Sequence, residues 1–260
     1  MTVVREPAVA GQFYPEDPAE LRALVSAMLR EVEPDADVPP KALIVPHAGY
    51  AYSGAVAASA YARLSRYRDV YTRVVLLGPC HRVPVVGMAL SAAHAFRTPL
   101  GDVAVDRDAL AMLQERGVRV FEPSHQYEHS LEVHLPFLQT VLGEFSLVPV
   151  VVGQAPARAV ASLLDTLWGG PETLVVVSSD LSHYLAYDAA RKQDAATCQR
   201  IERLEVDVAY EDACGATPLC GLLLAAKRRG MRVTTLDLRN SGDTGGDREF
   251  VVGYGAWMFA

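Results

Sequence analysis

Three histidines follow short apolar runs that have the composition of buried strands. His47 comes two residues after the first run, His81 follows the second, and His183 follows the third. The three runs are 42–45, 74–77 and 174–177. Runs of this kind are typical of parallel strands that are covered on both faces. Because functional groups gather at the carboxyl ends of strands in open α/β sheets, we expect the three imidazoles to share one site.

His47 and His81 are the first candidates for metal ligands. Imidazole is the commonest metal ligand in proteins, and each of these histidines lies in a loop beside Pro or Gly. A metal or catalytic role therefore competes with the simpler alternative, a hydrogen-bonded structural histidine. Two imidazoles make an incomplete site, so a third ligand is needed.

Cys214 is the cysteine best suited to be that ligand. It lies just before Thr217-Pro218, where a helix is predicted to start, and a helix N-terminus favours the thiolate form. Cys198 and Cys220 are expected to lie on helices and to pack in the core, and Cys80 should point away from the adjacent His81. The sequence contains no CxxC pair, the pattern that would indicate a structural zinc site.

The segment 178–183 brings Asp180 and His183 close together after a strand. One interpretation makes them a general acid–base pair or groups that orient the metal ligands. A second makes Ser178 or Ser179 a hydrolase nucleophile, although the G-x-S-x-G pattern is absent. The third is a polar strand end that caps the next helix.

The densest polar cluster is 125–137, which contains His129, Glu132 and His134. His129 and Glu132 would share a helix face, whereas His129 and His134 are spaced too widely for an H-E-x-x-H zinc helix. Unpaired burial of so many ionisable groups would be costly. We expect the cluster to line a polar pocket, with a solvated helix start as the alternative.

Composition narrows the class of protein. The chain has 260 residues, of which 50% are apolar and 21% charged, and a net charge of −7. These values suit a globular domain and give no support for nucleic-acid or anionic-membrane binding. Four cysteines without a framework, and no signal or membrane-spanning pattern, predict a cytoplasmic protein.

Alternating strands and helices predict a single three-layer α/β/α domain over residues 1–260, with a mostly parallel central sheet. Asp17, Ser53, Asp106 and Thr217 are expected to cap helices. The last two strands have no helix between them and should form an antiparallel pair at one edge. The expected strands are 42–45, 73–78, 85–91, 118–121, 146–152, 173–179, 231–238 and 249–259, with a loop or hairpin at 92–106.

Several segments together resemble the Memo family. They are AGQFY (10–14), PHAGYAYSG (46–54), GPCH (78–81), EHSLEVHLP (128–136), SSDLSH (178–183), and Cys214-Gly215 with Pro218. They occur in order along nearly the whole chain. The resemblance implies a fold similar to that of class III extradiol ring-cleavage dioxygenases, which hold Fe(II) with two histidines and a glutamate.

The resemblance also implies roles for individual residues. His47 and His81 would be metal ligands, with Cys214 at the place of the carboxylate, and His183 would match the acid–base histidine, with Asp180 nearby. Phe13 and Tyr52 would be aromatic side chains of the pocket. A thiolate ligand makes the site softer, so zinc or copper joins Fe(II) as a candidate metal.

Two functions follow as alternatives. The first is an Fe(II)-dependent, non-haem, dioxygenase-like oxidoreductase of unknown substrate. The second is a non-catalytic scaffold that binds a metal, a small molecule or a peptide in an inherited pocket. Bacterial and archaeal members of the family often accompany a radical-SAM protein, which the resemblance makes a candidate partner.

Overall fold

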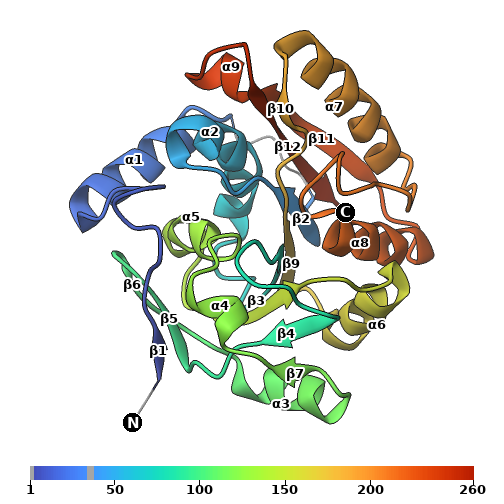
Figure 1. Cartoon of the computed structure of the whole chain (residues 1–260). Helices are drawn as coiled ribbons and strands as arrows, with labels where there is room; N and C mark the ends of the chain where they lie inside the picture. Colours follow the sequence, from blue (N-terminus) through green and yellow to red (C-terminus); the bar gives the residue numbers. More distant parts are fainter. Residues whose placement is uncertain (1–2, 34–37) are drawn as a thin grey trace.

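The fold is built on a nine-stranded mixed sheet, shown in the computed structural model of Figure 1, which describes residues 3–33 and 38–260. Four parallel strands form its centre in the order β2, β9, β3, β8. They are β2 (Ala42–Val45), β9 (Thr173–Ser178), β3 (Arg73–Pro79) and β8 (Ser146–Val152). The predicted parallel α/β core is therefore confirmed.

The two sides of this core are antiparallel. β12 (Val251–Phe259) pairs antiparallel with β2 and with β11 (Val233–Asn240), which confirms the antiparallel edge predicted for the C-terminus. The short β10 (His183–Leu185) also pairs with β12. On the other side, β4 (Met88–Leu90) runs antiparallel to β8 and is followed by β7 (Arg119–Val120).

A second, three-stranded sheet was only partly predicted. The expected hairpin in 92–106 is present as β5 (Ala95–Thr98) and β6 (Gly101–Ala104). β1 (Val4–Arg5) adds to it in parallel, so the start of the described chain is tied to this hairpin. Two residues of strand give too short a pattern to be recognised in the sequence.

Helices cover both faces of the large sheet. Figure 1 shows one group on the left of the view, α1 (Pro18–Arg30), α2 (Tyr50–Tyr61) and α5 (Leu135–Val141). The other group lies on the right, α6 (Ala157–Leu167), α7 (Tyr187–Glu202) and α8 (Ala216–Arg228). The remaining helices are α3 (Arg107–Glu115), α4 (Pro123–Gln126), α9 (Ser241–Thr244) and the 3-10 turns Ala62–Tyr67 and Glu132–His134.

The helix caps show where local sequence signals succeed and fail. The side chains of Asp17 and Asp106 accept hydrogen bonds from the first turns of α1 and α3, as predicted. Ser53 and Thr217 are not caps, because α2 begins at Tyr50 after Gly49 and α8 begins at Ala216. Both helices start directly at the end of a site loop, so the tertiary path of the loop, rather than a capping side chain, sets the first helical residue.

Small residues let α2 lie close to its neighbours. A Cβ atom added to Gly54 would come within 2.7 Å of the Met28 sulfur on α1. Such close packing of α1 and α2 fixes the segment that directly follows His47. Every helix in the described part of the chain falls short of the length and apolar character needed to cross a bilayer.

Candidate metal centre

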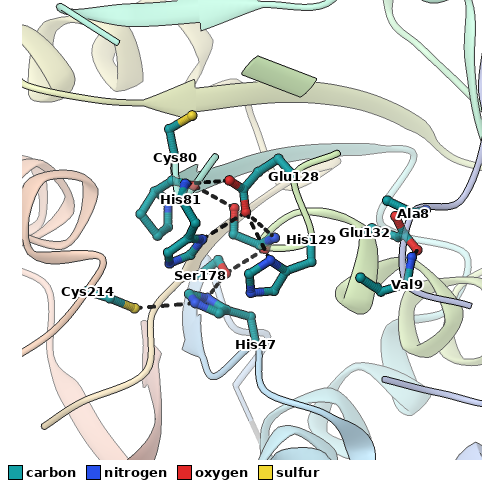
Figure 2. A network of polar contacts seen from close by, with 12 residues as sticks. Ala8, Val9, His47, Cys80, His81, Glu128, His129, Glu132, Ser178 and Cys214 are labelled. Atoms are coloured by element: carbon teal, nitrogen blue, oxygen red, sulfur yellow. Dashed lines mark hydrogen bonds and ion pairs between the residues drawn. The ribbon is translucent and has the colours of Figure 1, made fainter. Parts of the chain in front are cut away.

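The ends of three adjacent strands bring the predicted ligands together. β9 lies between β2 and β3, so His47 at the end of β2 and His81 after β3 flank the end of β9. Their ring centroids are 5.1 Å apart. The Cys214 Sγ lies 3.3 Å from His47 Nε2, and one donor atom each from His47, His81 and Cys214 lie within 4.8 Å of one another. Figure 2 shows the three side chains pointing toward a common point.

Hydrogen bonds set the tautomer of His47. Its Nδ1 lies 2.6 Å from Ser178 Oγ, and that hydroxyl donates its own proton to the Ser130 carbonyl at 2.6 Å. Ser178 can therefore only accept from His47, which places the imidazole proton on Nδ1. The Nε2 lone pair is left facing Cys214, as a metal ligand requires.

Glu128 sets the tautomer of His81 in a similar way, by accepting a hydrogen bond from its Nδ1. Its Oε1 lies 2.9 Å from His81 Nδ1, and its Oε2 accepts the His81 backbone N–H at 2.5 Å. Burial raises the pKa of Glu128, but the hydrogen bonds from His81 and Ser130 outweigh this effect and lower the pKa to about 2. An ionised carboxylate behind a histidine is a common arrangement in metal sites, because it fixes the ring and makes the free nitrogen a better donor.

Cys214 occupies a tightly packed corner before α8. Its backbone N–H donates to the Asp180 carbonyl at 3.3 Å, and Gly215 N–H donates to Ser179 Oγ at 2.9 Å. A Cβ atom on Gly215 would come within 2.5 Å of the Ser178 carbonyl oxygen, so only glycine fits beside the cysteine. Burial raises the pKa of the Cys214 thiol, and ligation therefore requires loss of its proton.

These observations fit a mononuclear metal ion. Two imidazoles have their Nδ1 atoms committed to acceptors and their Nε2 atoms free, and a buried sulfur completes a His2Cys set. Nitrogen and sulfur ligands of this kind suit zinc, copper and iron. A second group within the same distance, His81, Glu128 and His129, is less suitable, because the Glu128 carboxylate already accepts three hydrogen bonds.

The cluster opens into a cavity of about 1200 Å³. His183 lines it, and its Nδ1 lies 2.8 Å from the Leu181 carbonyl oxygen, so its Nε2 is the nitrogen free of that bond. Burial lowers the pKa of His183, which favours the neutral ring. Asp180 also lines the cavity and accepts the His47 backbone N–H at 2.7 Å. Burial raises the pKa of Asp180 to about 7.

Aromatic side chains form much of the remaining lining. Phe13 and Tyr52 both line the cavity, where the resemblance placed them. His129 lies between Phe13 and the metal ligands, with ring centroids 4.9 Å from Phe13 and 4.7 Å from His81. Its Nδ1 is 3.4 Å from Glu128 Oε1, without the geometry of a hydrogen bond.

Unlike His129, Glu132 and His134 do not line the cavity. Glu132 is fully buried and forms an ion pair with Arg5. Its carboxylate also accepts hydrogen bonds from the backbone N–H groups of Ala8 and Val9 and from the Tyr14 hydroxyl. Figure 2 shows it facing Ala8 and Val9, away from the histidines. The predicted pocket role does not fit this position. Glu132 instead anchors the segment before α1, including the neighbourhood of Phe13.

His134 is likewise a core residue, with its Nδ1 2.8 Å from the Tyr61 hydroxyl. The serines considered as nucleophiles are also buried, and neither Ser178 nor Ser179 lines the cavity. Their hydroxyls donate to backbone carbonyls, so the hydrolase alternative has no accessible nucleophile there. The sulfur of Cys80 points away from the cluster in Figure 2.

Sequence reasoning missed two groups. Glu128 was not assigned to His81, although it directly precedes His129 in the polar cluster. The lining residues Tyr254 and Phe250 lie on and before the last strand, where nothing in the local pattern marks them as cavity residues.

The comparisons with known proteins agree with the motif pattern. A family model described as "Memo-like protein" matches residues 5–258. A "MEMO1 family protein" of Aquifex aeolicus is 38% identical, covering 98% of this chain and 99% of the relative. One of Sulfolobus acidocaldarius is 36% identical, covering 97% and 98%.

Among solved structures, the uncharacterized protein JW3007 from Escherichia coli K12 is similar over 84% of this chain and 98% of its own, with a TM-score of 0.49 and 13% identity. That similarity is too weak to support a conclusion about either protein. The family match and the relatives cover nearly the full length of the chain. This chain belongs to the Memo family.

Proposed function

We propose that the protein is a non-haem, metal-dependent oxidoreductase that holds one Fe(II) ion at His47, His81 and Cys214. The observation that carries the proposal is the convergence of one donor atom each from His47, His81 and Cys214, all within 4.8 Å of one another, in the lining of a large cavity. Bound Fe(II) would supply redox chemistry at the cavity floor. Zinc and copper suit the same donors and are the alternative metals.

The residues around the ligands suit proton transfer to or from a bound organic ligand. His183 is partly exposed to the cavity, and its Nδ1 proton is committed to the Leu181 carbonyl. Its Nε2 can therefore accept a proton from a ligand in the cavity, because burial lowers the pKa and keeps the ring neutral. Asp180 holds the backbone of His47 and so maintains the position of that ligand.

Element-resolved metal analysis of anaerobically purified protein tests the metal site. We expect about one metal ion per chain in the wild type and loss of that ion when both His47 and Cys214 are replaced by alanine. Cys80→Ser is the matched control, because the Cys80 sulfur lies outside the ligand cluster. Wild-type stoichiometry in the double variant would disprove the site.

A second candidate function is a scaffold that binds metal and ligand without turnover. It is favoured by Cys214, which replaces the carboxylate ligand of the dioxygenases that the motifs resemble. Oxygen uptake by the Fe(II)-loaded protein with a panel of catechols separates the two functions. Metal-dependent ring cleavage would exclude the scaffold, and its absence across the panel would favour it.

A further inference from the structure

We propose that Arg82 is an anion-recognition residue, and that the organic ligand of the cavity carries a carboxylate or phosphate group. This inference rests on the proposed function, since it places the ligand beside the metal centre. It is independent of whether the ligand is turned over.

Arg82 is the one lysine or arginine among the described residues that line the cavity. It directly follows His81, so its backbone is fixed next to a predicted metal ligand. The other charged lining residues are acidic, namely Asp180, Glu211 and Asp247. The guanidinium of Arg82 is therefore the one cationic Lys or Arg group of the described lining that can attract an anion, in addition to the metal ion of the proposed function.

The guanidinium has no partner within the described protein. Some arginines of the described chain pair with carboxylates, as Arg73 does with Asp106 and Arg97 with Asp102, whereas the exposed Arg82 does not. No carboxylate or carbonyl of residues 3–33 or 38–260 accepts a hydrogen bond from Arg82. Its charge nevertheless acts on the site. Burial is the largest cause that lowers the pKa of His129, and the positive charge of Arg82 also lowers it.

The chemistry of the arginine side chain defines the ligand group. Guanidinium presents a rigid fork of N–H donors that matches two oxygen atoms of a carboxylate or phosphate. A group bound there lies beside His81, while Phe13, Tyr52 and Tyr254 offer apolar surface for the rest of the molecule. The cavity thus suits an organic anion better than a neutral molecule of the same shape.

Three probes with the same ring system test this inference with Co²⁺-loaded protein: 2-naphthoate, 2-naphthyl phosphate and the neutral 2-naphthamide, which matches 2-naphthoate in size. We expect wild-type protein to bind at least one anion about tenfold more tightly than the amide. R82Q should lose this preference and keep its affinity for the amide, whereas R82K should retain part of it. The two anions show which oxyanion the fork prefers.

R203Q is the matched control, because Arg203 is 67% exposed, does not line the cavity, and carries the same charge. Equal binding of the amide and both anions, no anion binding at millimolar concentration, or unchanged anion binding in R82Q would overturn the inference. Co²⁺ uptake is measured on the same samples. Failure of wild-type Co²⁺ uptake would refute the metal site itself, whereas normal uptake with no anion preference would refute only the role of Arg82.

Discussion

Replacing Ser178 with alanine should weaken metal binding without touching any proposed ligand. Ser178 Oγ lies 2.6 Å from His47 Nδ1 and donates its own proton to the Ser130 carbonyl at 2.6 Å. The alanine variant leaves the His47 Nδ1–H without its acceptor in a fully buried position. The imidazole is then free to rotate or to move its proton to Nε2, the nitrogen that faces Cys214.

The size of the effect follows from these contacts. Loss of a hydrogen-bonding partner behind a metal-binding histidine typically lowers metal affinity about 10- to 100-fold. This corresponds to about 1.4 to 2.7 kcal/mol. The range agrees with the cost of about 1 to 3 kcal/mol for leaving one buried polar group unsatisfied.

Competition for Zn²⁺ between the protein and a chromophoric chelator measures the affinity, and circular dichroism verifies the fold. Ser59→Ala is the matched control, since the Ser59 hydroxyl is buried and donates only to the Val56 carbonyl. If Ser178→Ala bound Zn²⁺ as tightly as wild type and Ser59→Ala, the tautomer argument for His47 would be refuted.

Three further predictions concern the stability of the frame around the site. Glu132→Ala should lower the free energy of unfolding by roughly 3 to 5 kcal/mol, because Arg5 would remain buried without its carboxylate; a smaller loss in urea denaturation would contradict the anchoring role. Gly215→Ala should cost about 1 to 3 kcal/mol, since its Cβ would lie 2.5 Å from the Ser178 carbonyl oxygen, and wild-type stability would contradict this crowding. Burial raises the pKa of Asp194 from 3.8 to about 6, so the native state loses stability as pH rises through that range. Asp194→Asn should therefore gain up to roughly 3 kcal/mol relative to wild type between pH 4 and 7, and pH-independent differences in urea denaturation would count against it.

Apolar runs and strand ends carried most of the fold prediction. The runs at 42–45 and 146–152 form strands with the predicted bounds, because continuous burial leaves an unbroken apolar pattern. The order of strands β2, β9 and β3 in the sheet cannot be predicted from any one segment of the sequence. It comes from packing between distant parts of the chain, and it is what brings His47 and His81 together.

The residues that hydrogen-bond to the proposed ligands, or that hold the surrounding segments, were harder to predict. Glu128 and Glu132 belong to the same polar cluster, yet one orients a histidine and the other holds Arg5. Local spacing cannot separate these roles, because each depends on a residue at least 47 positions away along the chain. Cys214 could be ranked above other thiols from its loop position alone, since a helix start is a local feature.

The long separation of the ligands has a consequence for how metal and folding are coupled. The contact between His47 and Cys214 joins residues 167 positions apart, and His81 comes from a third segment. In a zinc finger, ligands close in sequence let the metal organise an unfolded chain. In the proposed site the three ligands come from distant segments, so an ion would bind this set of ligands only after the sheet has formed. Metal at 100 times its dissociation constant would then stabilise the whole domain by about 2.7 kcal/mol, and its removal by a chelator would leave a folded protein with a lower melting temperature.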